Sequence, residues 1–201
     1  MTADTPKPAA RRTRLTPERE AEIYDTVLAV VREVGYDALT MDAVATRTHA
    51  SKATLYRQWK GKPELVASAL RHHKPVRSAD VDTGTLRGDL LALAAHADQA
   101  GMERDAALVR ALGHASHQHP DLRRALRELL VEPEVAGLDA MLRRAVARGE
   151  LAADTPAIDY VAHMMFGAFI ARQLIEDRPA DPEYLAAYID AAVLPALGVR
   201  A

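Results

Sequence analysis

The stretch that decides the fold is TMDAVATRTHASKATLYRQW, residues 40–59. Thr40 and Ser51 are residue types that cap helix N-termini, and each stands directly before a short segment with helical spacing. In the second segment Leu55 and Trp59 are four residues apart, so both lie on one helical face. The stretch therefore predicts two short helices joined by a tight turn.

The outer face of the second predicted helix suggests a function. When Leu55 and Trp59 face inward, Ala53 and Arg57 point away from the core at 100° per residue. A small residue allows close approach to a DNA major groove, and a guanidinium can donate two hydrogen bonds to guanine. The alternative is that this face is only solvated surface and that Thr54 is only a capping hydroxyl.

Further helices are predicted on both sides of this stretch. Thr16-Pro17 begins a helix that Gly35 ends in the left-handed conformation, and Lys62-Pro63 begins another that ends near residue 74. The free N–H groups at the start of that last helix suit a DNA phosphate. The polar stretch 75–84 is interpreted as a junction.

Longer helices are predicted after the junction. Pro133 is expected to kink or break one of them because its ring would clash with the carbonyl of Leu129, and Pro195 is expected to end the last. No stretch alternates with period two for long, so the predicted fold is all-α with about nine helices. We divide the chain into a flexible basic arm (1–15), a head (16–74), the junction (75–84) and a body (85–201).

Composition narrows the function classes. The 201 residues include no cysteine, which excludes disulfide scaffolds, thiolate metal sites and cysteine nucleophiles. Residues 1–62 carry eleven basic and eight acidic side chains, whereas the remainder carries fifteen and twenty. A basic front attached to an acidic rest is compatible with DNA binding. In the arm, Arg11, Arg12 and Arg14 fit either a minor-groove contact or a solvated tail.

At these residues the chain resembles the TetR family of transcriptional repressors. The matching positions are Gly35, Thr40, Val44-Ala45, Ser51-Lys52-Ala53-Thr54-Leu55-Tyr56, Trp59, Lys62 and Leu65. His49 stands at the turn, where the family usually has glycine. A left-handed residue is often needed there, and histidine is among the better tolerated alternatives.

The resemblance implies a DNA-binding surface and an assembly. Base-edge contacts are implied for Ala53 and Arg57, with Lys52 as a further candidate, and phosphate contacts for Thr40, Lys52, Thr54, Tyr56 and Lys62. The implied partner is a palindromic operator in double-stranded DNA, bound by a homodimer in the cytoplasm at the nucleoid. We expect no cofactor, no metal and no catalytic residues. We also expect no membrane association, because residues 1–14 do not form a signal peptide and the apolar run 160–171 is too short to span a bilayer.

The second half resembles a regulatory domain of the same family through DTGTLRGDL (82–90) and RAVARGEL (144–151). In that family the last two helices form the dimer and the middle helices enclose an effector. The resemblance thus implies dimer helices that begin at Thr155 and Asp181. Apolar residues rich in Met and Phe, with one imidazole that can anchor a polar group, also predict a pocket for an unidentified, mainly apolar effector, lined in part by Met102, Leu112, Met141, His163, Phe166 and Phe169. Each of these side chains is as readily explained as plain core.

Two rival functions stay open at this level. A helical enzyme or metal-dependent protein would use His163 or the group His114, His117 and His119, although the chain has no His-Glu-x-x-His, P-loop or Gly-x-Ser-x-Gly pattern. A regulator that answers to a protein partner instead of a small molecule is the second rival. The carboxylate pairs Glu132/Glu134 and Asp80/Asp82 lie in predicted loops or helix flanks and are expected to be solvated.

Overall fold

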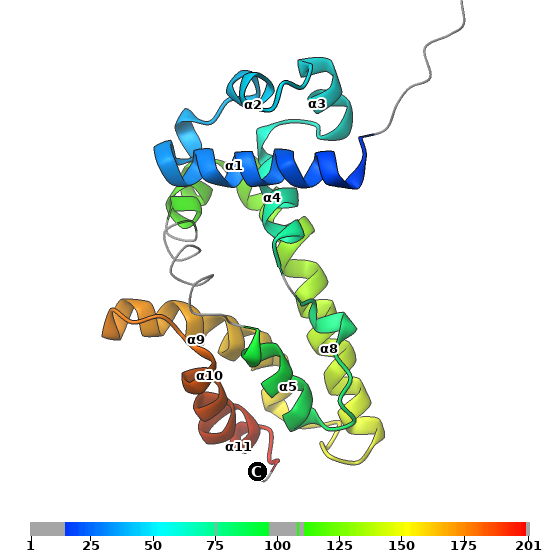
Figure 1. The fold of residues 1–201 in the computed structure, drawn as a ribbon. Helices are drawn as coiled ribbons and strands as arrows, with labels where there is room; N and C mark the ends of the chain where they lie inside the picture. The colour runs from blue at the N-terminus through cyan, green and yellow to red at the C-terminus, as the bar shows by residue number, and fades with distance from the viewer. Residues whose placement is uncertain (1–14, 75, 97–107, 109–110, 200–201) are drawn as a thin grey trace, which may run out of the picture.

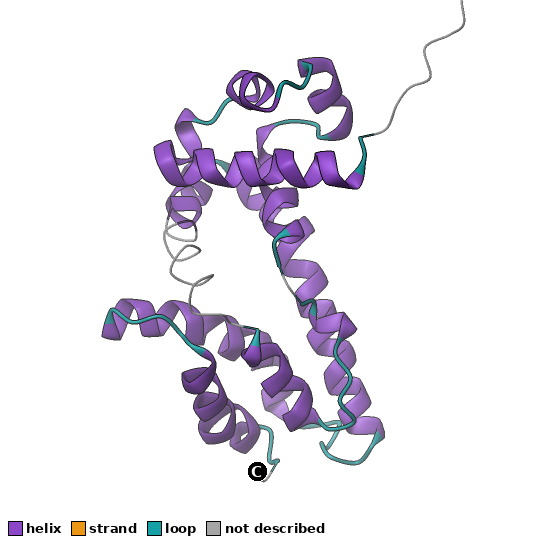
Figure 2. Ribbon diagram, in the orientation of Figure 1, coloured by secondary structure: helices purple, strands orange, loops and turns teal. Residues whose placement is uncertain are grey.

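The computed structural model describes residues 15–74, 76–96, 108 and 111–199. Every regular element of these residues is a helix (Figure 2), which confirms the all-α prediction. Met102, Arg11, Arg12 and Arg14 lie outside the described residues. The elements are α1 (Pro17–Ala38), α2 (Met41–Thr48), α3 (Lys52–Gln58), α4 (Lys62–His72), the 3-10 turn η1 (Ser78–Asp80), α5 (Leu86–Ala95), a helical segment at 111–118, α7 (Pro120–Leu126), the π-helical η2 (Arg127–Val131), α8 (Glu132–Ala147), the 3-10 turn η3 (Pro156–Tyr160), α9 (Val161–Glu176), α10 (Pro182–Tyr188), the π-helical η4 (Ile189–Val193) and α11 (Leu194–Ala196).

The helix starts follow the capping signals of the sequence. The hydroxyls of Thr16, Thr40 and Ser51 accept hydrogen bonds from backbone N–H groups three residues later, at 3.1–3.3 Å. At Gly35 the backbone has φ +80° and ψ +171°, so this residue kinks α1 instead of ending it in the left-handed helical conformation that the sequence predicted, and three more residues turn helically after it.

The two late prolines are accommodated in the same way. η2 precedes Pro133 and η4 precedes Pro195, and in each segment an N–H donates to the carbonyl five residues earlier: Glu132 to Arg127, and Leu194 to Ile189. The wider π turn makes room ahead of the proline ring. The helix around Pro133 is therefore neither broken nor ended there, whereas α11 stops one residue after Pro195, as expected.

The helices form an upper and a lower group (Figure 1). α1 lies across the upper group with α2 and α3 above it, and α4 descends from it toward α8. α5, α9, α10 and α11 lie beside the far end of α8. No helix within the described ranges is both long and apolar enough to cross a bilayer.

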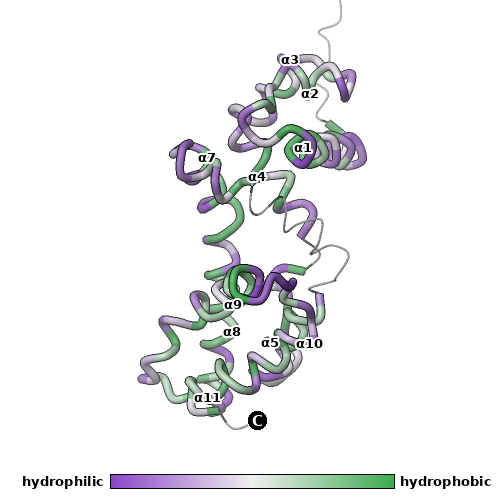
Figure 3. Tube along the Cα trace, turned by 90° about the vertical axis from the view of Figure 1, so that its left-hand side faces the viewer, coloured by the Kyte–Doolittle hydropathy of each residue, from purple (hydrophilic) through white to green (hydrophobic). Residues whose placement is uncertain are grey.

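Two hydrophobic cores correspond to these groups, but their membership differs from the order along the chain. The upper core contains side chains of α1–α4 together with Leu108, Leu112, Ala115 and Leu122. The lower core contains side chains of α5, α8, α9, α10, η4 and α11. The segment 111–118 and α7 follow α5 in sequence, yet they pack with the head; Figure 3 shows α7 beside α4.

Candidate nucleic-acid interface

The turn between α2 and α3 is built around His49. Its backbone is left-handed, with φ +51° and ψ +30°, as the sequence predicted. The Ala50 N–H donates to the Ala45 carbonyl at 3.0 Å, and the His49 N–H closes the same helix end. The turn therefore forms with histidine in the place of glycine.

α3 is anchored firmly to α1. The Leu55 and Trp59 side chains are 0% and 3% exposed, and the Trp59 ring meets Tyr24 of α1 edge-on at 5.5 Å. At the surface the Gln58 amide donates to the Glu20 carboxylate at 2.8 Å. These contacts fix which face of α3 points outward.

The outward face carries the residues that the sequence singled out for base contacts. Ala53, Tyr56 and Arg57 are all exposed. Within the described ranges, Arg57 has no hydrogen-bond or ion-pair partner, so its guanidinium is available to a ligand. A free guanidinium beside a small residue on a rigid helix is suited to a base edge in a major groove.

Three of the predicted phosphate ligands border this face. The Thr40 hydroxyl accepts from the Ala43 N–H, which leaves its own proton to donate, and the Thr54 hydroxyl lies 2.8 Å from the Ser51 hydroxyl in a hydrogen bond that either group can donate. The Lys52 ammonium lies 2.6 Å from the Asp42 carboxylate, and both side chains are more than half exposed. An exposed pair of this kind contributes little free energy, so Lys52 can exchange Asp42 for a phosphate.

Lys62 is placed differently from the other predicted ligands. Its ammonium donates to the Tyr36 carbonyl at 3.1 Å and lies 4.1 Å from the centre of the Tyr36 ring. Burial lowers the pKa of Lys62, and the nearby Asp37 opposes that shift only in part. The ammonium thus joins the N-terminus of α4 to the end of α1.

The same Tyr36 also contacts the segment that precedes α7. The His119 ring lies 5.2 Å from the Tyr36 ring, and its Nε2 is 2.6 Å from the Asp37 carboxylate. The sequence offered His119 only as a member of a histidine cluster. Its pairing with Asp37, 82 positions away, had no local signal. Among the described residues no group of three or more His, Cys, Asp or Glu side chains is placed to hold a metal ion.

The residues predicted to line an effector pocket are not brought together in the described part of the chain. Leu112 is buried in the upper core and Met141 in the lower core. His163, Phe166 and Phe169 are exposed on α9, the two phenylalanines at 39% and 40%. The reason is that, among the described residues, α9 packs on the rest of the chain through one side, so an apolar sequence did not mean burial.

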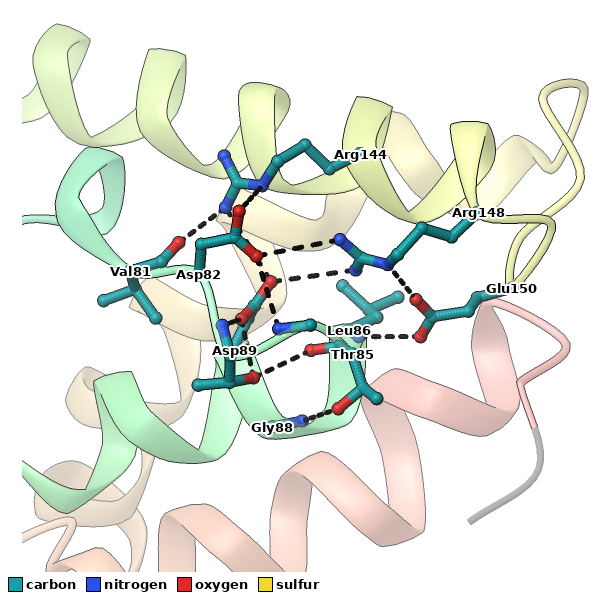
Figure 4. A network of polar contacts seen from close by, with 11 residues as sticks. Val81, Asp82, Thr85, Leu86, Gly88, Asp89, Arg144, Arg148 and Glu150 are labelled. Carbon is teal, nitrogen blue, oxygen red and sulfur yellow. Dashed lines mark hydrogen bonds and ion pairs between the residues drawn. The ribbon is translucent and has the colours of Figure 1, made fainter.

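The two quoted motifs of the second half form one polar network (Figure 4). Asp89 is fully buried, and its Oδ1 accepts from the Thr83 N–H at 2.5 Å and the Thr83 hydroxyl at 2.8 Å. Its Oδ2 faces Arg144 and Arg148, each at 3.8 Å. Glu150 pairs with Arg148 and accepts from the Leu86 N–H. The motifs thus bind the loop before α5 to the C-terminal end of α8.

One sequence expectation is wrong. The carboxylate of Glu134 is not solvated: the residue is 6% exposed, and it binds Ser78 and Lys74. Burial alone would raise the pKa of Glu134, but hydrogen bonds from Lys74 and Ser78 outweigh it and hold the pKa below its usual value. The expectation failed because it considered only the position of Glu134 at a predicted helix flank.

The fold and the exposed face of α3 define a helix-turn-helix DNA-binding regulator. The family described as bacterial regulatory proteins, tetR family, matches residues 23–69. A second family, described as tetracyclin repressor-like, C-terminal domain, matches residues 80–192. The chain belongs to the TetR family of transcriptional regulators.

Three similar proteins each match most of the chain's length. The chain is 34% identical over 179 residues to an HTH-type transcriptional regulator of Mycobacterium tuberculosis, covering 89% of this chain and 88% of the relative. It is 33% identical over 177 residues to the DNA-binding transcriptional repressor TetR of Mycobacteroides abscessus, covering 88% and 92%. The crystal structure of the TetR family transcription regulator SCO0332 is similar, with a TM-score of 0.68 and 28% identity, covering 92% of this chain and all of that one.

Proposed function

We propose that the protein is a transcriptional repressor that binds a palindromic operator as a homodimer and leaves it when a small molecule binds the body. The observation that carries the DNA-binding part is the exposed guanidinium of Arg57, which has no partner in the described part of the chain and lies on a helix whose inner face is anchored by Leu55 and Trp59. Repression is supported by the 33% identical relative that is itself described as a repressor.

The contacts proposed for this surface follow the side chains as they lie. Ala53 and Arg57 read base edges, since both face outward from α3. Thr40, Lys52, Thr54 and Tyr56 border them and meet phosphates. For Lys62 a phosphate contact requires its ammonium to leave Tyr36, so we assign it the role of holding the N-terminus of α4 in place.

A second copy of the chain is proposed to cover α9. This helix exposes a stripe of large apolar side chains, which is unusual for a surface that faces only water. α10 and η4 add the exposed small residues Ala187 and Ala191 next along the chain. The exposed members of the stripe, including one residue just before the helix, are Tyr160, Phe166, Phe169, Ile170, Leu174 and Ile175.

The dimer explains why the operator is proposed to be palindromic. A two-fold axis presents two copies of α3 to successive major grooves about 34–36 Å apart, so the two half-sites repeat in opposite orientation. The cytoplasm, at the nucleoid, is the proposed location because the proposed partner is chromosomal DNA.

The effector is proposed to be mainly apolar with at least one hydrogen-bonding group. The proposed pocket set includes Met141, an imidazole at His163, and the aromatic rings Phe166 and Phe169. Because the last three are exposed on α9, the proposed site is completed at the dimer interface. The effector releases DNA only if it binds one form of the dimer more tightly than the DNA-competent form, namely the form in which the spacing of the two α3 helices does not match successive major grooves. Operator DNA then weakens effector binding by the same factor.

Selection of DNA from a random pool tests the proposal. We expect the wild-type protein to select a two-fold symmetric motif, and Arg57→Ala to lose its preference at one position of each half-site, at a cost of about 1–3 kcal/mol per contact. Arg143→Ala is the matched control, because it removes the same charge from an exposed position on α8. An unchanged motif with Arg57→Ala would refute the assignment of base reading.

Turnover of a substrate, or stoichiometric metal that remains after chelation, would favour the rival enzyme or metal protein. A motif without symmetry would contradict the dimeric arrangement. If operator binding responds to a protein partner and to no small molecule, the ligand-responsive part of the proposal fails while the DNA-binding part stands.

A further inference from the structure

Within the described residues, the chain passes between the upper and the lower core at two places, and these lie close together. One is the continuous helix α7–η2–α8, whose first part belongs to the upper core and whose last part belongs to the lower core. The π-helical η2 lies between them and contributes no buried residue. The other is the segment that follows α4, which reaches η1 and packs on α8.

Glu134 holds these two crossings together. Its carboxylate accepts hydrogen bonds from the Ser78 N–H at 3.1 Å and from the Ser78 hydroxyl at 2.8 Å. The same hydroxyl lies 2.9 Å from the Glu134 carbonyl. The Lys74 ammonium, just beyond α4, lies 2.5 Å from the same carboxylate oxygen. One buried side chain at the start of α8 therefore binds both the end of the head and the junction.

The backbone on either side of this contact is unusually close. Gly137 is one turn after Glu134, and a Cβ built on it would lie 2.6 Å from the Ala79 nitrogen and closer still to the Ser78 hydroxyl. Only the absence of a side chain lets η1 approach α8 to this distance. We name Lys74, Ser78, Glu134 and Gly137 the clamp.

We propose that Glu134 is a positioning residue for operator binding. The head moves as one body with helix 111–118 and α7, and η2 is the joint between this body and the lower core. Glu134 sets the angle at which the body is held on the lower core. The inference deepens the proposed function, because a dimer reads a palindrome only if both recognition helices keep their spacing. η2 suits a joint since none of its side chains is buried and a π-helical turn interrupts the regular α-helical ladder.

The first test measures distances and needs neither DNA nor an effector. The chain has no cysteine, so pairs introduced at exposed sites take spin labels specifically. One pair, Val34→Cys with Arg124→Cys, joins α1 to α7. The other, Val34→Cys with Asp139→Cys, joins α1 to α8. Labelled protein is diluted with unlabelled protein so that only distances within one chain are recorded.

The proposal expects different responses from the two pairs. With Glu134→Gln, the distribution for Val34–Asp139 broadens or shifts, while that for Val34–Arg124 keeps its width. The matched control is Glu183→Gln, an exposed glutamate on α10 outside the clamp and the joint, which leaves both distributions unchanged. Two unchanged distributions with Glu134→Gln would overturn the clamp. Broadening of both would overturn the single body of head and α7.

The second test asks whether the clamp acts on operator spacing. We expect Glu134→Gln to weaken binding to the selected operator about 2- to 30-fold, the range seen for residues that couple distant sites. Discrimination against operators with one base pair added or removed between half-sites should fall as well. If the variant were merely partly unfolded, the fraction of active protein would fall equally for the selected operator, the operator with one base pair added and the operator with one removed.

Ser78→Ala separates the clamp from an effect of the Glu134 substitution itself. It removes the hydroxyl that binds both Glu134 groups, and we expect the same loss of spacing discrimination. Undiminished discrimination in both variants would overturn the positioning role. The distance test keeps its meaning if no palindrome exists, so failure of this inference is distinguishable from failure of the proposed function.

Discussion

The structure predicts that Gly137→Ala lowers the free energy of unfolding, although helix propensity alone predicts that it raises it. Alanine in place of glycine inside a helix normally raises the free energy of unfolding by about 0.5–1 kcal/mol. At this site the added Cβ would lie 2.6 Å from a backbone nitrogen of η1, which cannot rotate away. The nitrogen must move by about 0.4 Å to reach even the tight limit of 3.0 Å, and overpacking of this kind costs about 1–3 kcal/mol.

The expected net result is a loss of about 0.5–2 kcal/mol, measured by urea denaturation at one fixed protein concentration. Gly113→Ala is the matched control, because that helical glycine has nothing within 4 Å of the built Cβ. It should gain about 0.5–1 kcal/mol. Equal stabilisation by the two substitutions would refute the close approach of η1 to α8, and with it the tightness of the clamp.

Three further outcomes are expected. Lys62→Ala should lower the free energy of unfolding and leave the salt dependence of DNA binding unchanged; a slope lower by about one unit would instead show that Lys62 meets a phosphate. Ile170→Glu together with Leu174→Glu should give monomers by sedimentation at micromolar concentration, and a persistent dimer would exclude α9 from the interface. Burial, with Asp121 and Asp37 nearby, raises the pKa of Tyr36 to about 12. The folded state therefore keeps a proton that the unfolded state loses above pH 10, and the unfolding free energy should fall by up to about 3 kcal/mol between pH 10 and 12. Urea titrations of Tyr36→Phe should lack this fall, and an identical fall in that variant would assign it to other groups.

The sequence alone determined the helices and the face of α3 that points outward. Capping hydroxyls at Thr16, Thr40 and Ser51 act on N–H groups three residues away, and the spacing of Leu55 and Trp59 is a property of one helix. Interactions of such short range are readable from the order of residues. For the same reason the motif within residues 35–65 is enough to indicate the family.

Only the tertiary structure decided which helices share a core and which apolar residues are covered. Helix 111–118 and α7 pack with the head although the chain reaches them after α5, and Glu134 is buried because Ser78, 56 positions away, is folded onto it. His163 and Phe166 lie in an apolar segment, yet their own chain leaves them exposed. Burial and pairing depend on contacts between distant segments, and hydrophobic periodicity within one helix carries no information about its partner.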